Sequence, residues 1–299
     1  MILGDVLAKT KDHFAKLGYA SAKVDSELLL STALGWKRLD LYLKQDYPMT
    51  EQELHNCREL VRRRSKGEPV AYILGYKDFY NIRLNVNPSV LIPRSETEHI
   101  VDEAINYFKE HSIESPVVVD LGAGSGCVGL AVAKEVPAAK VLCIEKSNEA
   151  FQTLVKNIEL NELQTRVLAI HSSVEELNMD QLSREFSNFF DGADFNIDAL
   201  LSNPPYIEEG DSNVAKDVFE FEPHAALFAE DKGLVCYKTW PEKFQQKLKP
   251  SALLAFEMGF EQGPAVKEIF TAKTFLKDIS IIKDYSENDR IVRAYNLGE

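Results

Sequence analysis

The residues with the clearest chemical meaning are Ser202-Asn203-Pro204-Pro205-Tyr206, which follow an apolar stretch of the chain. Proline has no backbone N–H, and two successive prolines hold the backbone stiff and extended. The motif therefore presents the Asn203 side-chain oxygen and the Pro204 carbonyl as fixed hydrogen-bond acceptors, with the Tyr206 ring beside them. This arrangement could hold a planar NH2 group, whose two hydrogens would be donated to the two acceptors while Tyr206 stacks on its plane.

A second motif is the glycine-rich turn in VVVDLGAGSGCVGLAVA, which is predicted to join a strand to a helix. Gly122, Gly124 and Gly126 would let the backbone turn tightly and approach a ligand closely. Two cofactors fit this pattern. Gly124 begins a literal match to the dinucleotide fingerprint GxGxxG. Asp120, ahead of the first glycine, is typical of the loop that binds S-adenosylmethionine (SAM) in class I methyltransferases.

Acidic residues at two strand ends bear on the choice between these cofactors. Glu145 ends the next predicted strand, KVLCIE, and its carboxylate could accept hydrogen bonds from both ribose hydroxyls of either cofactor. Asp120 favours SAM, because the amino-acid portion of SAM carries an ammonium group, whereas a carboxylate would repel the pyrophosphate of NAD. With an acid at each strand end, a tight turn without a ligand is the less favoured interpretation.

The elements that position these motifs follow from hydrophobic periodicity. Residues 2–66 show apolar residues at helical spacing and no strand pattern, which indicates a small all-helical domain. After a hairpin pattern at residues 79–88, strands and helices alternate, which predicts a doubly wound, mostly parallel α/β sheet ending in two strands of which one is antiparallel. Thr50 and Ser95 are each followed three residues later by glutamate, so a capping box is expected at both.

The predicted topology brings the two motifs together. The strand that precedes Asn203 is the fourth of the sheet, and the first and fourth strands of such a sheet flank the switch point where ligands bind. Asn203 should therefore face the same crevice as the glycine loop. With SAM in that loop, the held nitrogen would point at the sulfonium methyl group, in line for displacement. An amide nitrogen would need no strong general base, because its N-methylated cation is very acidic.

Composition constrains the class of protein. The 299 residues are enough for two domains, and no apolar run reaches the ~18 residues of a membrane helix. The cysteines lack CxxC spacing and the histidines lack HxH or HxxxH spacing, so no metal site is expected, and buried thiols fit a reducing cytoplasm. Residues 1–84 contain 14 basic and 11 acidic residues, whereas the remainder contains 20 and 36. An acidic catalytic half disfavours contact with nucleic acid.

Further stretches make the chain similar to a known family. Asn-Pro-Pro-Tyr resembles the motif of amino methyltransferases that act on adenine, cytosine or glutamine. The chain as a whole resembles the release factor glutamine methyltransferases, the PrmC/HemK family. The similar stretches cover the linker and the catalytic domain: GEPVAYILGYKDFY (67–80), VNPSVLIPRSETE (86–98), NPPYIEEGD (203–211), FEPHAALFAEDKGL (221–234), FEMGFEQGPAV (256–266) and KDYSENDRIVRA (283–294). The N-terminal helices match in type rather than in motif.

The resemblance implies methyl transfer from SAM to the N5 side-chain nitrogen of the glutamine in the Gly-Gly-Gln motif of class I peptide chain release factors. The expected segments are a helical, substrate-recruiting domain (1–68), a linker with a β-hairpin (69–95) and a SAM-dependent methyltransferase domain (96–299). By motif position, the resemblance places SAM against Asp120, Gly122, Ala123, Gly124, Ser125, Gly126, Glu145, Val174 and Asn203.

The same resemblance assigns glutamine binding to Asn203, Pro204, Pro205 and Tyr206, with Asn203, Pro204 and Tyr206 catalytic. Two positions depart from the family pattern. Ser95 replaces a frequent proline and is expected to cap the following helix. Ser173-Val174 stands where some members have Asp-Trp near the adenine, and Val174 is expected to supply an apolar wall there.

Three alternative functions fit parts of the same sequence. An adenine-N6 nucleic-acid methyltransferase shares the Asn-Pro-Pro-Tyr motif, because adenine also presents a planar NH2, but it should carry a basic recognition domain. A catalytically silent SAM-binding scaffold would not require Asp120, Glu145 and Asn203 together. An NAD oxidoreductase leaves the Asn-Pro-Pro-Tyr motif unexplained.

Overall fold

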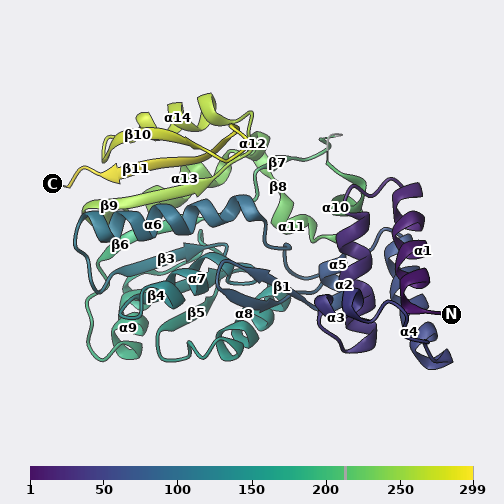
Figure 1. Ribbon diagram of the computed structural model, residues 1–299. Helices are drawn as coiled ribbons and strands as arrows, with labels where there is room; N and C mark the ends of the chain where they lie inside the picture. The colour runs from purple at the N-terminus through teal and green to yellow at the C-terminus, as the bar shows by residue number, and fades with distance from the viewer. Residues whose placement is uncertain (212–213, 299) are drawn as a thin grey trace. The chain divides into compact units, whose positions relative to one another are not determined.

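The computed structural model describes residues 1–211 and 214–298. The chain forms two compact units (Figure 1). The helical unit comprises Met1–Tyr76 together with Ala215–Phe221, and the sheet unit comprises Lys77–Val214 and Glu222–Glu299. The short segment Ala215–Phe221 therefore belongs with the N-terminal helices, although it lies far from them in the sequence.

The helical unit confirms the all-helical prediction for the N-terminal region. Its elements are α1 (Leu3–Lys16), α2 (Ala22–Leu34), α3 (Arg38–Leu43), α4 (Glu51–Ser65), α5 (Val70–Leu74) and α10 (Lys216–Phe221). Helices α1 and α4 both pack against α2. The predicted capping box at α4 is present: Thr50 Oγ1 accepts from the Glu53 N–H, and Glu53 Oε2 accepts from the Thr50 N–H at 2.8 Å. A buried ion pair joins α4 to α2, with Arg64 Nε 2.9 Å from Asp25 Oδ2.

The sheet unit contains a seven-stranded sheet in the order β10-β11-β9-β6-β3-β4-β5. The strands are β3 (Val117–Leu121), β4 (Lys140–Glu145), β5 (Val167–His171), β6 (Ile197–Ser202), β9 (Leu248–Glu257), β10 (Leu276–Lys283) and β11 (Asp289–Asn296). The five strands from β9 to β5 pair in parallel. Strand β11 runs antiparallel to both β9 and β10, so the predicted sheet type with one antiparallel closing strand is confirmed.

Helices cover both faces of this sheet, as predicted (Figure 1). One apolar layer contains residues of α6 (Glu98–Glu110), α7 (Cys127–Glu135) and α8 (Asn148–Leu160). The opposite layer contains residues of α9 (Met179–Phe189), α13 (Val235–Phe244) and α14 (Gly263–Thr271). Successive strand residues alternate between the layers: Val118 lies in the first and Val119 in the second. Helix α9 was not predicted, although it presents buried Leu182 and Phe186 to its layer.

Shorter elements fill the connections of the sheet unit. They are the hairpin β1 (Tyr76–Phe79) and β2 (Ile82–Asn85), the turn η1 (Ser95–Thr97), β7 (Ile207–Glu208), α11 (His224–Leu227), β8 (Phe228–Ala229), α12 (Glu230–Gly233) and η2 (Gln245–Lys247). Strands β7 and β8 pair in parallel. In the described ranges, no helix is both long enough and apolar enough to cross a membrane.

The capping box expected at Ser95 is wrong. Ser95 begins a 3-10 turn and α6 begins at Glu98, while the Ser95 hydroxyl donates to Glu96. The Glu98 carboxylate instead accepts from the Tyr80 N–H at 2.9 Å. Tyr80 lies in the turn between β1 and β2, with a left-handed φ of 50°, so its N–H is not part of the strand pairing. Glu98 accepts from this N–H and is therefore not used for the capping box.

Candidate active site

The two motifs leave the sheet side by side. Strands β3 and β6 are neighbours, and their last residues, Leu121 and Ser202, are directly paired. The Ser202 hydroxyl also donates to the Leu121 carbonyl at 2.8 Å. The glycine loop therefore starts one residue after Leu121, and Asn203 starts the neighbouring loop. The predicted switch point between the first and fourth strands is confirmed.

The glycines of the loop are required by its backbone. Gly122, Gly124 and Gly126 have φ of +66°, +57° and +86°, in the left-handed region that favours glycine. At Gly126 a Cβ atom would also lie 2.5 Å from Leu154 Cδ1. The loop is tied to the next strand, since the Ala123 N–H donates to the Ile144 carbonyl at 3.0 Å.

Glu145, at the end of β4, lies against this loop. One carboxylate oxygen accepts from the Gly124 N–H at 2.8 Å, and the other accepts from the Ser147 N–H at 2.7 Å. The side chain is largely buried, and both bonds fix its orientation. Each carboxylate oxygen still has an acceptor site for a ligand hydroxyl. The structure thus brings Glu145 and Gly124 together, as expected for a cofactor site.

Asp120 is buried beneath the turn into α7. Its Oδ2 accepts from the Gly129 N–H at 2.9 Å. Burial raises its pKa to about 7, with the Gly129 hydrogen bond acting in the opposite direction and the charge of Glu145 adding to the rise. A nearby cation would favour the ionised form of this carboxyl group.

Asn157 of α8 is a site residue that the sequence analysis missed. Its side-chain NH2 donates to the Ser125 carbonyl at 2.9 Å and to the Asn85 carbonyl at 3.0 Å, and its oxygen accepts from the Asn85 N–H at 2.7 Å. One fully buried amide therefore connects the glycine loop to the end of β2. The available signal was an asparagine on the apolar face of a predicted helix.

The apolar boundary of the loop includes Trp240 of α13, also missed by the sequence analysis. A Cβ atom on Gly122 would lie 3.3 Å from the Trp240 ring. The Trp240 indole N–H donates to Glu175 Oε1 at 2.8 Å. Val174 is buried in the same apolar layer as Trp240. This layer supplies an apolar wall beside the glycine loop.

Asn203 is held by a buried hydrogen-bond chain. Its side-chain Nδ2 donates to Thr97 Oγ1 at 3.1 Å, and Thr97 Oγ1 donates to Glu257 Oε2 at 2.6 Å. The other oxygen of Glu257 accepts from the Tyr206 hydroxyl at 3.3 Å. Thr97 and Glu257 are both essentially inaccessible to solvent. The sequence analysis predicted Asn203 and Tyr206 but neither Thr97 nor Glu257, which connect them.

Burial dominates the electrostatics of this chain. Desolvation raises the pKa of Glu257 to about 7, while the Thr97 hydrogen bond and the positive charge of Arg290 limit the rise. The pKa of the Tyr206 phenol is raised by desolvation and by the neighbouring Glu257 carboxyl group. Tyr206 is therefore a neutral hydrogen-bond donor at physiological pH.

The backbone after the Asn-Pro-Pro-Tyr motif is fixed by distant segments. The Tyr206 carbonyl accepts from Gln262 Nε2 at 2.9 Å, and a Cβ atom on Gly233 would lie only 2.0 Å from that carbonyl oxygen. Glu222 accepts from the Ile92 N–H at 3.1 Å and pairs with Arg94. These residues belong to stretches singled out by their resemblance to family motifs, and Gln262 and Gly233 are the two that lie against the Tyr206 carbonyl.

Comparisons with known proteins match family models to the N-terminal region and to the middle of the chain. A family model described as the PrmC N-terminal domain matches residues 5–75, and one described as the TRM5/TYW2 methyltransferase domain matches residues 94–192. Three relatives are named release factor glutamine methyltransferase. That of Geobacter sulfurreducens is 36% identical, covering 96% of this chain and 94% of the relative. Those of Rhodopirellula baltica (34%; 96% and 94%) and Caulobacter vibrioides (35%; 94% and 92%) are similarly close.

A solved structure supports the fold. A crystal structure of the hMettl16 catalytic domain in complex with the MAT2A 3'UTR hairpin 6 superposes with a TM-score of 0.56. It is 13% identical, and the match covers 84% of this chain and 83% of that one. At this identity, the likeness concerns the fold alone.

Proposed function

Because the chain belongs to the family of release factor glutamine methyltransferases, we propose that it methylates the glutamine of the Gly-Gly-Gln motif in class I peptide chain release factors. The methyl group comes from SAM and is transferred to the N5 side-chain nitrogen. The observation that carries this proposal is the orientation of the Asn203 side chain, directly after the end of β6. Its NH2 end is engaged by Thr97, which leaves its oxygen as the acceptor for a substrate NH2.

The residues around the glycine loop fit SAM better than a dinucleotide. Two carboxyl groups, Asp120 and Glu145, lie at the loop, which would repel a pyrophosphate but suit an ammonium group and ribose hydroxyls. Bound SAM supplies an electrophilic methyl group on its sulfonium sulfur. In the proposal, Glu145 accepts from the ribose hydroxyls, and the remaining contacts come from Asp120, Gly122, Ala123, Gly124, Ser125, Gly126, Val174 and Asn203.

The Asn-Pro-Pro-Tyr motif orients the substrate nitrogen. Asn203 Oδ1 and the Pro204 carbonyl accept the two hydrogens of the glutamine NH2, and Tyr206 covers the plane of the amide, with Pro205 keeping the loop extended. Such positioning is the main contribution available, because an amide nitrogen is a poor nucleophile and needs its lone pair directed at the methyl carbon. As the N–C bond forms, the bond between the methyl carbon and the sulfonium sulfur would break, and the sulfur would leave as a neutral thioether within the spent cofactor. The methylated amide nitrogen would then carry a positive charge, become strongly acidic and release a proton to solvent.

The proposed substrate is a protein, and the helical domain expected at residues 1–68 recruits it. This role is supported by the absence of any motif residue in residues 1–66 and by the excess of basic residues in residues 1–84, in contrast to the acidic remainder. The acidic balance of the catalytic half also disfavours the adenine-N6 nucleic-acid alternative. Release factors act on ribosomes, so we place the enzyme in the cytoplasm.

Mass spectrometry provides the direct test. A release factor with an intact Gly-Gly-Gln motif is incubated with the protein and SAM and then digested. The expected result is one added methyl group on that glutamine, and none on a release factor in which the glutamine is replaced by alanine. A duplex DNA oligonucleotide in a parallel reaction should stay unmodified. Methylation of the DNA alone, or at a different residue of the release factor, would contradict the proposal.

A further inference from the structure

An asparagine side chain has nearly the same shape in both orientations, but only one of them suits a substrate NH2. With Oδ1 towards the substrate, Asn203 accepts a hydrogen bond from the substrate NH2. In the reversed orientation, the Asn203 NH2 would face the substrate NH2, and neither group could accept a hydrogen bond from the other. We call the two proposed acceptors, Asn203 Oδ1 and the Pro204 carbonyl, the amide clamp. The clamp requires a neighbouring group that fixes the orientation of the Asn203 side chain. The residues that could do so are those bonded to its other end.

We propose that Thr97 and Glu257 are positioning residues. Which of their atoms donate and which accept hydrogen bonds determines which end of the Asn203 side-chain amide faces the substrate. An ionised Glu257 carboxylate can only accept. The single hydroxyl hydrogen of Thr97, whose oxygen lies 2.6 Å from Glu257 Oε2, is therefore donated to Glu257. Only lone pairs of Thr97 Oγ1 remain for Asn203, 3.1 Å away, so the NH2 end of Asn203 must face Thr97.

The same carboxylate also holds the other side of the clamp. The Tyr206 hydroxyl donates to Glu257 Oε1, so one buried group orients both the acceptor amide and the aromatic ring. A carboxylate in the interior costs stability unless it is fully hydrogen-bonded, and an apolar or neutral residue of similar size would avoid this cost. The proposal gives this buried charge a function, since a neutral amide in its place could bond Thr97 in either direction.

The test compares variants of Thr97 in the full-length enzyme. Thr97→Val keeps the shape but removes the hydroxyl, and Thr97→Ser keeps the hydroxyl. Assays at about pH 8 keep Glu257 ionised, because its pKa is about 7. We expect Thr97→Val to lower kcat about 10-fold, the usual effect of losing one buried hydrogen bond, with little change in SAM affinity or in KM. Thr97→Ser should restore most of the activity, and Glu257→Gln should also lower kcat.

A double-mutant cycle separates positioning from general structural damage. If Thr97 acts only through Asn203, then Thr97→Val should have no further effect on kcat in an Asn203→Ala background. Multiplicative losses in the double variant would overturn the proposal, as would full activity of Thr97→Val. The inference rests on the proposed function, but the two fail differently: a wild-type enzyme that does not methylate a release factor refutes the function before any variant is compared.

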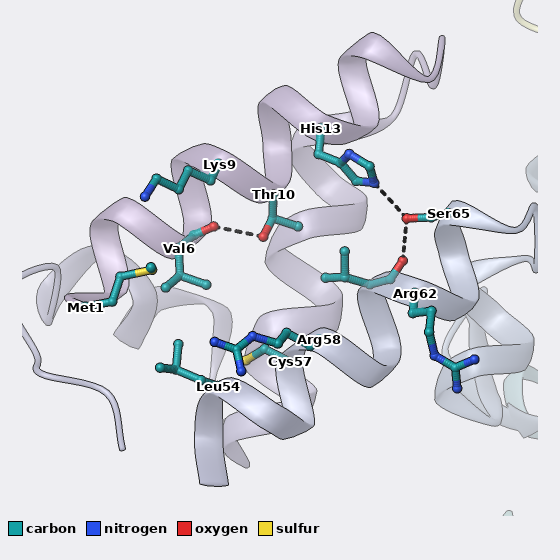
Figure 2. A pocket seen from close by; sticks show the side chains of 11 residues that line it. Met1, Val6, Lys9, Thr10, His13, Leu54, Cys57, Arg58, Arg62 and Ser65 are labelled. Carbon is teal, nitrogen blue, oxygen red and sulfur yellow. Dashed lines mark hydrogen bonds between the residues drawn. The ribbon is translucent and has the colours of Figure 1, made fainter. Parts of the chain in front are cut away.

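A separate observation concerns the helical unit. A groove of about 400 Å³ lies between α1 and α4 (Figure 2). Buried Leu54, Cys57 and Thr10 line it, and the exposed side chains of Lys9 and Arg58 extend over its edges. The lining also contains Arg62 and His13 but no acidic residue. Within the described part of the chain, neither Lys9 nor Arg58 forms an ion pair.

We infer that this groove binds an acidic amphipathic helix of the release factor, which identifies where the proposed recruitment takes place. Helices α1 and α4 both pack on α2, and their side chains form the two sides of the groove, with His13 Nε2 2.8 Å from Ser65 Oγ at one end (Figure 2). An amphipathic helix places its apolar face in such a groove, and acidic residues flanking that face would pair with Lys9 and Arg58. Charge complementarity of this kind mainly affects association and KM rather than the chemical step.

The test is the double charge reversal Lys9→Glu/Arg58→Glu, with Lys11→Glu/Lys16→Glu as the matched control on exposed residues of α1 outside the groove. The first variant should raise KM for an intact release factor about 10-fold without changing kcat, and it should leave KM for an isolated Gly-Gly-Gln domain unchanged. The control should behave as wild type. Equal KM values for both variants would refute the site, and a dimer that dissociates only in the groove variant would assign the groove to a second copy of this chain.

Discussion

Replacing Asn203 tests the amide clamp most directly. Asn203→Ala removes the acceptor for one substrate N–H. It also removes the hydrogen bond that Thr97 Oγ1 accepts from Asn203 Nδ2 at 3.1 Å. Loss of one positioned polar contact of this type typically lowers kcat by about 10²–10³. SAM affinity should stay close to that of the wild type, because the glycine loop and Glu145 supply most of the proposed cofactor contacts. Single-turnover methyl transfer and calorimetry with SAM measure the two quantities separately.

Asn203→Asp is the informative companion variant. It keeps the size of the side chain and its acceptor, but it places a second carboxylate next to Thr97, whose only hydroxyl hydrogen is already donated to Glu257. Two carboxylates would then compete for one hydrogen, which displaces the side chain. The negative charge is tolerable near a sulfonium group, so we expect a small residual activity, above that of Asn203→Ala and well below that of the wild type.

Two results would refute this reasoning. If Asn203→Ala turns over within a few-fold of the wild type, the substrate amide is not held by this side chain. If the variant loses SAM binding and turnover together, Asn203 is chiefly a cofactor ligand, and the acceptor for the substrate NH2 lies elsewhere. Retained thermal stability of both variants is the control for correct folding.

Three further predictions follow from the site and the loop. Glu145→Ala should weaken SAM binding by roughly 1–3 kcal/mol, the usual loss for charge-assisted hydrogen bonds, and an unchanged calorimetric affinity would remove Glu145 from the ribose site. Gly126→Ala should lower the free energy of unfolding by roughly 2–5 kcal/mol, because φ is +86° and the new Cβ would meet Leu154. Gly18 has the same φ but open space around it, so Gly18→Ala should lower the free energy of unfolding by only about 1–2 kcal/mol. Denaturant titrations measure both values. The pKa of Glu257 is raised from 4.5 to about 7 in the folded state, so the folded protein retains a proton that the unfolded chain releases, and stability should fall as pH rises through this interval. Glu257→Gln should remove part of this fall in Tm-versus-pH measurements, the rest belonging to Asp120, and an identical slope in the variant would contradict the assignment.

The sequence by itself determined the sheet and the two loops that the site uses. Alternation of apolar strands and amphipathic helices fixed the doubly wound fold, since each strand must bury both faces. Glycines at positions that require left-handed φ marked the loop after β3, and two prolines marked the loop after β6. Parallel strands in this topology end at one edge of the sheet. The sequence could therefore predict that the ends of β3 and β6 are neighbours, as the pairing of Leu121 with Ser202 shows.

The tertiary structure decided which residues support those loops. Thr97 and Glu257 are 160 positions apart and form one hydrogen bond, and no local pattern specifies such a pair. Asn157 and Trp240 reach the glycine loop from helices on opposite faces of the sheet, so their roles depend on how those helices pack. Ser95 failed as a helix cap for the same reason: Glu98 was within reach of the Tyr80 amide, and a nonlocal donor took the carboxylate that the local motif required. Local periodicity specifies elements and turns, whereas the partners of buried polar groups are chosen only when distant segments come into contact.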